Sequence, residues 1–275
     1  MNYLFRRNSA ELEKVVRELW EELQNCDFEP LDFELGFGDD GKMPSICIHG
    51  QTLEAQLRGK VDRVDSWANG GKTYFRIVDY KTGKKDFDYC DVFNGLNLQM
   101  LLYLFALELE GENLLGENRV AAGVQYFPAR VPLVSSDNVL SEEEAEDERR
   151  KLWKRSGLLL DDEVVLDAME HGDTVIRLPI KRKKDGTVSG DLANEKQFAL
   201  LKLYVFGLLG KMVDEIASGD VTPNPYTRGS SHNACSYCPY TSICHLETVD
   251  GRRNYKTMPS QLFWEEVQKA VETNG

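Results

Sequence analysis

The chain has 275 residues, of which 41% are hydrophobic and 10% aromatic, an ordinary composition for a globular protein. Its 33 lysines and arginines against 46 aspartates and glutamates give a net charge of −13, the opposite of the balance expected for a dedicated nucleic-acid-binding protein. Any contact with nucleic acid must therefore be local or shared with another surface. The sequence starts without an apolar secretory segment and contains no stretch that resembles a bilayer span, so we expect a reducing cytoplasmic location and no membrane partner.

Regular spacing of apolar residues divides the first part of the chain into one helix and two strands. Apolar residues at three- and four-residue steps predict an amphipathic helix over residues 9 to 25, with a polar face rich in glutamate. β-Branched and aromatic residues predict strands from Ile46 to Asp65 and from Thr73 to Lys81. The NGG sequence at residues 69 to 71 predicts a hairpin turn between them.

The rest of the chain alternates apolar segments with charged ones. Residues 92 to 110 and 195 to 217 predict two long helices, of which the first is apolar enough to be mostly buried, and residues 120 to 127 predict another strand. Charge runs alternate with short apolar patches over residues 135 to 190. We interpret that stretch as a peripheral insertion or lobe of a single domain that spans residues 1 to 275.

The sequence DYK at residues 79 to 81 is the sharpest chemical signal in the chain. Alternation along a strand places Asp79 and Lys81 on the same face, so an acid and an amine lie side by side. Hydrolysis of a phosphodiester needs an ion that clamps phosphate oxygens and supplies hydroxide, and carboxylates are the ligands that Mg²⁺ prefers. Asp62, in GKVDRVD on the adjoining strand, supplies a second carboxylate if the hairpin register places it opposite Asp79.

Gln99 and Tyr103 add two polar groups to an otherwise apolar helix. They are four residues apart and share a helix face, from which both can hydrogen-bond to a phosphate or to an attacking water. A purely structural interpretation is also open. Asp62, Asp79 and Lys81 fit a solvent-facing charge pattern on an edge strand, and the glutamine and tyrosine fit a hydrogen-bonded pair in the core. The joint order and spacing of all five residues favour a catalytic site.

The segments GKVDRVD, VDYKTGKK and GLNLQMLLYL, in this order, resemble the PD-(D/E)XK nuclease domain of the RecB family. The likeness is greatest to the C-terminal nuclease domain of the B subunit in ATP-dependent helicase-nucleases of the AddAB or RexAB type. It covers residues 57 to 104 closely, and the cysteines near the end of the chain extend it. The resemblance implies an α/β fold of the restriction-endonuclease type, with a mixed central β-sheet flanked by helices.

The resemblance also implies a role for each matching residue. Asp62 and Asp79 become the expected ligands of Mg²⁺ or Mn²⁺, helped by the backbone carbonyl of Tyr80, and Lys81 becomes the catalytic lysine. The further matches to the family pattern are Gln99 with Tyr103, and Thr82 after the lysine. The implied activity is metal-dependent exonuclease hydrolysis of DNA in the repair of double-strand breaks by recombination, on a single strand delivered by a helicase partner subunit. The alternative is a structural or DNA-binding subunit that keeps the nuclease fold without cutting.

Cys235, Cys238 and Cys244 crowd into the sequence CSYCPYTSIC, within a cysteine-rich clasp at residues 230 to 248. This C-x2-C-x5-C spacing can close a metal site because two thiolates on a tight turn reach one ion and the third folds over it. The family resemblance implies a [4Fe-4S] cluster whose fourth cysteine lies upstream of the nuclease strands. The other cysteines, none of which matches that position, are Cys26, Cys47 and Cys90.

Two further interpretations fit the same three cysteines. Unmetallated thiols would pack as small apolar residues. A zinc site would need His232 or His245 in place of the missing thiolate, which would make the tail a zinc-ribbon interaction domain.

A helical His or Glu before the first strand completes the metal shell in the family, and this chain offers no convincing match. The glutamates of the first helix, from Glu11 to Glu22, have the spacing of a solvated face, and Glu54 is a weak candidate on the strand of Asp62. Both this residue and the fourth cysteine are missing on the N-terminal side, so we expect the chain to be the C-terminal piece of a larger subunit. Such a piece would bind metal weakly and cut poorly, because one ligand and one part of the clasp are gone.

Overall fold

The computed structural model describes residues 2–136, 138–172, 174–183, 185–229, 232–244, 246 and 252–274. The chain divides into two compact units. The first comprises Met1–Ile46, Gln56–Phe87 and Gln99–Lys202, and the second comprises Cys47–Ala55, Asp88–Leu98 and Leu203–Gly275. None of the helices in the described ranges combines the length and the apolar character that a membrane crossing requires.

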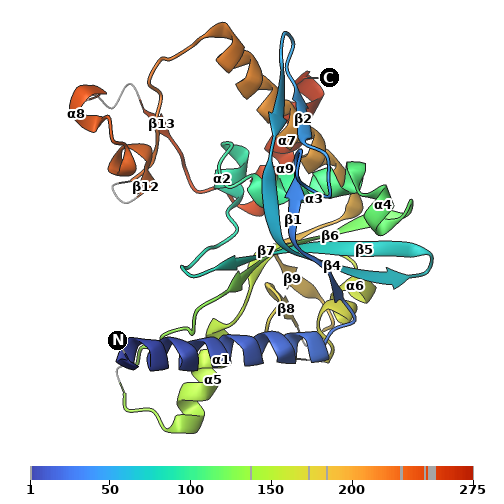
Figure 1. Ribbon diagram of the computed structural model, residues 1–275, viewed down its shortest axis with the longest axis vertical. Helices are drawn as coiled ribbons and strands as arrows, with labels where there is room; N and C mark the ends of the chain where they lie inside the picture. The colour runs from blue at the N-terminus through green and yellow to red at the C-terminus, as the bar shows by residue number, and fades with distance from the viewer. Residues whose placement is uncertain are drawn as a thin grey trace. The chain divides into compact units, whose positions relative to one another are not determined.

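A six-stranded sheet forms the centre of the first unit (Figure 1). Its strands are β1 (Glu29–Phe37), β4 (Gly59–Asn69), β5 (Lys72–Lys81), β6 (Arg119–Pro128), β7 (Ser156–Leu160) and β10 (Leu192–Ala193), in the order β1-β4-β5-β6-β7-β10. The pairs β5–β6 and β7–β10 are parallel, and the other neighbours are antiparallel. The expected mixed sheet of an α/β fold is therefore confirmed.

The hairpin of β4 and β5 forms where the NGG sequence predicts it. Asn69 pairs with Lys72 across the turn. Gly70 and Gly71 have φ values of +58° and +77°, a left-handed conformation that glycine adopts without the steric penalty of a Cβ. The turn thereby determines the register of the whole hairpin, which positions every side chain discussed below.

The prediction of a single strand from Ile46 to Asp65 is wrong. The chain there divides into β2 (Ile46–His49), β3 (Glu54–Leu57) and β4. β2 and β3 form a separate two-stranded sheet, closed by the turn that begins at Gly50. Only β4 belongs to the central sheet, because the chain reverses direction between Gly50 and Leu53. The glycine and the polar residues in this segment favour a turn over an extended strand.

The helices α1 (Asn2–Gln24) and α3 (Gln99–Glu110) cover opposite faces of the central sheet (Figure 1). On one face, Val15 and Leu19 of α1 pack against Val78 and Phe127 of β5 and β6. On the other face, α3 contacts the same two strands, and its residues from Met100 to Leu107 are all buried. The expected burial of this apolar segment is confirmed, and α1 begins earlier than the apolar spacing predicts.

The helix expected over residues 92 to 110 is interrupted. α2 (Tyr89–Phe93) ends before Gly95, and α3 begins only at Gln99. Gly95 and Asn97, between the two helices, have φ values of +80° and +55°, which a continuous right-handed helix cannot contain. The break makes Gln99 the first residue of α3 rather than part of a helix interior.

Residues 135 to 190 contribute to the sheet as well as to the surface. α5 (Glu142–Leu152) is a charged surface helix whose first turn is closed by a capping box on Ser141. β7, in contrast, lies between β6 and β10, and its residues Leu158 to Leu160 are buried. Part of the stretch expected to be peripheral therefore belongs to the central layer. The remaining elements of this unit are α4 (Glu112–Leu115), α6 (Glu163–Met169), β8 (Ile180–Arg182) and β9 (Val188–Gly190).

The second unit contains α2, the C-terminal part of α7 (Glu195–Ser218) and α9 (Ser260–Asn274). α7 confirms the expected helix and ends at Gly219, where φ is +73°. α9 packs against α2 through Tyr89 and Phe263, whose ring centroids are 5.0 Å apart. The other elements are β11 (Tyr226–Arg228), β12 (His232–Asn233), the 3₁₀ helix η1 (Ala234–Tyr237), α8 (Thr241–Cys244) and β13 (Arg253–Asn254).

Candidate active site

The β4–β5 hairpin carries the two carboxylates of the candidate site. Its antiparallel register runs from Asn69 opposite Lys72 to Arg63 opposite Val78, and Asp62 and Asp79 are the residues that follow the last of these pairs. Residues directly opposite in an antiparallel pair point to the same face. The pairs up to Arg63 are those that the sequence interpretation requires, and the shared face of Asp62 and Asp79 stays a prediction. Alternation along β5 places Lys81 on the face of Asp79.

Backbone and side-chain contacts orient both acids. Asp62 Oδ2 accepts a hydrogen bond of 2.8 Å from the backbone N–H of Tyr80. Asp79 Oδ2 lies 2.5 Å from Lys81 Nζ. The side chain of Asp79 is 12% exposed and that of Lys81 is 37% exposed, so the acid is largely covered while its amine partner reaches solvent.

The electrostatics of this face fit a divalent cation. Burial raises the pKa of Asp79 above its usual value, the ion pair with Lys81 acts in the opposite direction, and the charge of Asp62 raises the pKa further. Two carboxylates close enough to repel each other gain from a shared cation. Oxygen donors of this kind suit Mg²⁺ or Mn²⁺, so the residues present fit the metal that the fold implies.

The opposite face of the same hairpin carries a buried network of charges. Arg63 Nη2 and Arg76 Nη2 donate hydrogen bonds of 2.9 and 3.2 Å to Glu22 Oε1 on α1. Asp65, between the two arginines, forms ion pairs with both. Because side chains alternate along a strand, these residues point toward α1 and the two carboxylates of the candidate site point away from it.

The expectation that the glutamates of α1 form a solvated face is wrong for Glu18 and Glu22, which are 9% and 5% exposed. Glu22 lies 2.5 Å from Arg155 Nη2, and Glu18 lies 2.8 Å from Arg177 Nε. Helical spacing alone could not show this, since the compensating cations come from remote parts of the chain. These glutamates lie on the α1 side of the sheet, where arginine side chains neutralise them.

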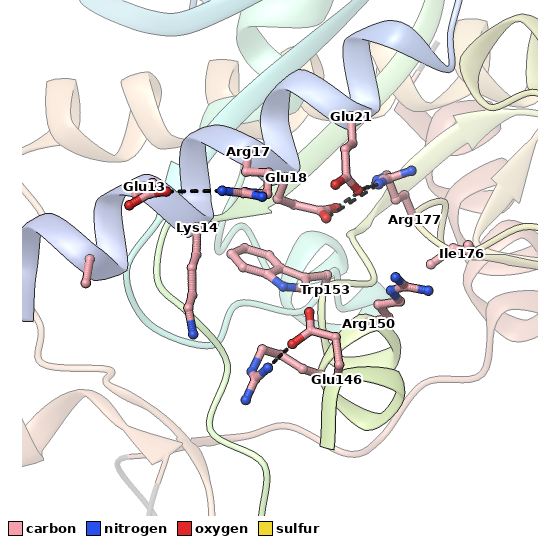
Figure 2. Close-up of a pocket in the computed structure, with 12 residues that line it drawn as sticks. Glu13, Lys14, Arg17, Glu18, Glu21, Glu146, Arg150, Trp153, Ile176 and Arg177 are labelled. Atoms are coloured by element: carbon pink, nitrogen blue, oxygen red, sulfur yellow. Dashed lines mark hydrogen bonds and ion pairs between the residues drawn. The ribbon is translucent and has the colours of Figure 1, made fainter. Parts of the chain in front are cut away.

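A pocket beside α1 lies away from the carboxylate pair. Figure 2 shows that acids lining it are paired with arginines: Glu18 and Glu21 with Arg177, and Glu13 with Arg17. Each of these acids has a cationic partner, and the pocket lies on the face of the sheet covered by α1. It therefore suits a cation less well than the carboxylate pair does.

Gln99 and Tyr103 lie on α3, which contacts β5 and β6 on the face opposite α1. Gln99 Nε2 donates a hydrogen bond of 3.3 Å to Tyr103 Oη, and the Tyr103 ring stacks on Phe37 with centroids 5.3 Å apart. A Cβ atom on Gly59 would lie 1.9 Å from Tyr103 Oη. The tyrosine therefore needs a glycine at the start of β4, three residues before Asp62.

The three tail cysteines lie around η1 and α8 in the second unit. Cys238 and Cys244 are exposed, and Cys235 is partly exposed. The Thr241 hydroxyl donates hydrogen bonds of 3.2 and 2.8 Å to the carbonyl oxygens of Cys235 and Cys238, which folds this segment back on itself. The cysteines are accessible to an ion or cluster, and their role as ligands stays a prediction.

The candidates for a fourth ligand to the tail cysteines have other contacts or are not described. The Cys90 thiol is buried and donates to the carbonyl of Lys256 at 2.8 Å. The Cys26 thiol donates to the carbonyl of Phe28 at 3.3 Å. His245 and the side chain of His232 lie outside the described residues.

Reasoning from the sequence missed one group of potential metal ligands. This group consists of Cys47, His49 and Glu54, whose ligand atoms all lie within 4.8 Å of one another. It is the one such group of three or more His, Cys, Asp or Glu side chains among the described residues. Glu54, expected on the strand of Asp62, begins the separate strand β3 instead. The available signal was the alternation of Cys47 and His49 in ICIH, which puts both on one face of a strand.

Comparison with known proteins agrees with this geometry. The family model of the PD-(D/E)XK nuclease superfamily matches residues 2–245. Across 98% of its length the chain is 36% identical to the B subunit of the ATP-dependent helicase/deoxyribonuclease of Clostridium acetobutylicum, and equally to that of Clostridium novyi. It is 33% identical, across 99% of its length, to the B subunit of the same name from a Thermoanaerobacter species.

The chain spans 24% of the length of each of these relatives. Because the family model matches most of its residues, the chain belongs to the PD-(D/E)XK nuclease superfamily.

Proposed function

We propose that this chain is the metal-dependent nuclease part of a helicase-nuclease subunit and that it hydrolyses phosphodiester bonds of DNA. The supporting observation is that Asp62 accepts the backbone N–H of Tyr80, next to Asp79, and raises the pKa of Asp79 through its charge, with Lys81 Nζ 2.5 Å from Asp79. The relatives are named helicase/deoxyribonuclease subunits, which favours DNA as the substrate and a helicase as the partner.

In this proposal Asp62 and Asp79 hold Mg²⁺ or Mn²⁺, together with the backbone carbonyl of Tyr80. When bound, the ion polarises the phosphate and makes hydroxide available near neutral pH. The N–H of Tyr80, 2.8 Å from Asp62 Oδ2, orients that carboxylate, and Lys81 orients Asp79. Such contacts restrict the rotamers of ligand side chains and so prepare them for the ion.

Lys81 acts on the nucleophile and on the phosphate. Its ammonium group lies between a largely covered acid and solvent, where a phosphate can approach. In that position it stabilises the negative charge that develops on the phosphate oxygens and orients the attacking water.

Gln99 and Tyr103 position the substrate or the water. A glutamine amide has two N–H donors, of which one reaches the Tyr103 hydroxyl at 3.3 Å. The second can donate to a phosphate oxygen. The hydroxyl that receives the first bond can in turn donate its own proton to a phosphate or a water.

The rest of the proposal concerns the surroundings of the site. With a net charge of −13, the chain needs a partner surface to supply much of the phosphate contact, as a helicase subunit that feeds in a single strand would do. Exonuclease action in double-strand break repair and a cytoplasmic location belong to the same proposal. A [4Fe-4S] cluster on Cys235, Cys238 and Cys244 belongs to it as well.

The test measures metal binding and DNA cleavage on the same variants. Asp62→Asn and Asp79→Asn are each expected to weaken Mn²⁺ binding to the chain by at least about tenfold, because each removes a charged ligand. Cleavage of an end-labelled single strand in Mg²⁺ should fall in parallel, in this chain or in the helicase-nuclease that contains it. Asp39→Asn is the matched control, because Asp39 is an exposed acid paired with Arg58.

The two candidate functions predict different results. A non-cutting subunit that keeps the nuclease fold would show the same DNA cleavage in the helicase-nuclease before and after Asp79→Asn. Unchanged Mn²⁺ affinity in both aspartate variants would show instead that these carboxylates do not share an ion, and would reject the proposed site.

A further inference from the structure

A second group of metal donors lies on the β2–β3 hairpin, which carries none of the proposed nuclease residues. Cys47 and His49 come from β2 and Glu54 from the start of β3, and their ligand atoms lie within 4.8 Å of one another. We propose that these three side chains form a binding site for Zn²⁺. This site does not depend on the proposed nuclease function, because it shares no residue with it.

Alternation along β2 explains why two donors share one face. Ile46 and Ile48 are 5% and 1% exposed, so the strand buries one row of side chains. Cys47 and His49 are the intervening residues and point to the outer face. The burial of the two isoleucines thereby determines where the thiol and the imidazole point.

Glu54 completes the set with a separate carboxylate oxygen for each neighbour. Its Oε1 lies 2.8 Å from His49 Nδ1, and its Oε2 lies 3.8 Å from Cys47 Sγ. In tetrahedral zinc sites, metal–ligand distances imply ligand atoms about 3.4–3.6 Å apart. The two separations, one to each carboxylate oxygen, lie on either side of this value, and all three ligand atoms lie within 4.8 Å of one another, so the donors are close enough to converge on one ion by side-chain movement.

The backbone of the hairpin is held in place independently of any ion. Gly50 N–H donates to the carbonyl of Leu53 at 2.9 Å, and Gln51 N–H donates to Asp214 Oδ1 on α7 at 2.6 Å. A Cβ atom on Gly210 of α7 would lie 2.8 Å from the carbonyl oxygen of His49, so helix and hairpin are in close contact. A fixed backbone reduces the entropy lost when the three side chains converge on an ion.

The donor chemistry favours zinc over the metal of the nuclease site. A thiolate and an imidazole are soft or borderline ligands that suit Zn²⁺, whereas Mg²⁺ and Ca²⁺ prefer oxygen donors alone. The side chains of His49 and Glu54 are 70% and 65% exposed, which leaves room for water at a fourth position. A surface ion pair between His49 and Glu54 would account for two of the residues. The Cys47 thiol adds a third donor to this pair through its hydrogen bond of 3.8 Å to the same carboxylate.

The test uses the chain with its tail thiols removed, because Cys235, Cys238 and Cys244 would also bind zinc. The background therefore carries serine at these three positions, which are all at least partly exposed. Zinc binding is measured by calorimetry under reducing conditions with excess Mg²⁺, so that the carboxylates of the nuclease site are occupied. Cobalt then replaces zinc, because a thiolate bound to Co²⁺ gives a charge-transfer absorption.

We expect one equivalent of Zn²⁺, and a loss of affinity of at least about tenfold in each of Cys47→Ser, His49→Ala and Glu54→Gln. The cobalt charge-transfer band should disappear in Cys47→Ser and persist in Cys26→Ser, the matched control. Binding that survives Cys47→Ser with unchanged affinity, or the absence of a zinc equivalent in this background, would overturn the proposal. If the triple-serine background does not fold, the same question is tested in the unmodified chain. Cys47→Ser should then lose one equivalent of thiolate-bound Co²⁺, and an unchanged cobalt spectrum would contradict the proposal.

Discussion

Glu22 of α1 lies 2.5 Å from Arg155, the residue that immediately precedes β7. The same carboxyl group accepts hydrogen bonds from Arg63 and Arg76 on the β4–β5 hairpin. One side chain thus connects a helix, a hairpin and a distant strand. The three arginine side chains are at most 2% exposed, so water cannot replace the glutamate if it is removed.

Replacement of Glu22 is expected to destabilise the protein strongly. Glu22→Gln should lower the free energy of unfolding by about 3 to 5 kcal/mol, because three buried guanidinium groups lose a shared carboxylate and keep only Asp65 and Glu18 as counter-charges. Urea unfolding followed by circular dichroism measures the loss. Glu13→Gln is the control: Glu13 is paired with Arg17 but its side chain is 71% exposed, so its loss should stay under about 1 kcal/mol. Equal losses in the two variants would contradict the proposed role of burial.

Stability should also decrease in acid because of Glu22. Burial acts to raise the pKa of this carboxyl group, but Arg155, Arg76 and Arg63 lower it from 4.5 to about 2. The folded-state pKa lies below the unfolded value, so the contribution to stability is present above about pH 4.5 and is lost as the pH falls toward 2. The shift corresponds to roughly 3 kcal/mol at most. Unfolding free energies at about pH 6 and about pH 3 should differ more in the unmodified chain than in Glu22→Gln, and equal differences would argue against this linkage.

Lys81 should affect catalysis without being needed for metal binding. Lys81→Ala is expected to reduce DNA cleavage by at least about 100-fold, because the variant loses the group that stabilises charge on the phosphate. Its Mn²⁺ affinity should be unchanged or higher, since a cation has been removed from beside Asp79. Lys72→Ala, at the other end of β5, is the matched control and should retain full cleavage. A parallel loss of metal binding in Lys81→Ala would point to a structural role.

Gly59 and Tyr103 should behave as a coupled pair. Gly59→Ala places a Cβ atom 1.9 Å from the tyrosine hydroxyl and is expected to lower the free energy of unfolding by about 1 to 3 kcal/mol. Tyr103→Phe removes the atom in closest conflict, so the double variant should lose less than the sum of the single losses. Gly83→Ala is the control, because a Cβ there meets no atom within 4 Å. Additive losses would show that Tyr103 does not contact this strand.

Much of the fold could be predicted from local patterns. The turn at Gly70 and Gly71, the burial of α3 and the extent of α7 all follow from glycine positions and apolar spacing over a few residues. The breaks inside two predicted elements could not be recognised from these patterns. The breaks between β2 and β3 and between α2 and α3 each depend on a few residues, including Asn97 in a left-handed conformation, inside segments that otherwise look continuous.

The sequence by itself determined the family and predicted the residues of the candidate nuclease site. Alternation along a strand and the NGG turn are local properties, so GKVDRVD and DYK were enough to predict that Asp62, Asp79 and Lys81 share a face. Only the tertiary structure decided which acids are buried and which side chains meet. Glu22 is buried because three arginines from remote segments surround it, and Cys47 meets Glu54 because a second hairpin folds back on itself. Such contacts depend on long-range packing, which local spacing along the chain does not record.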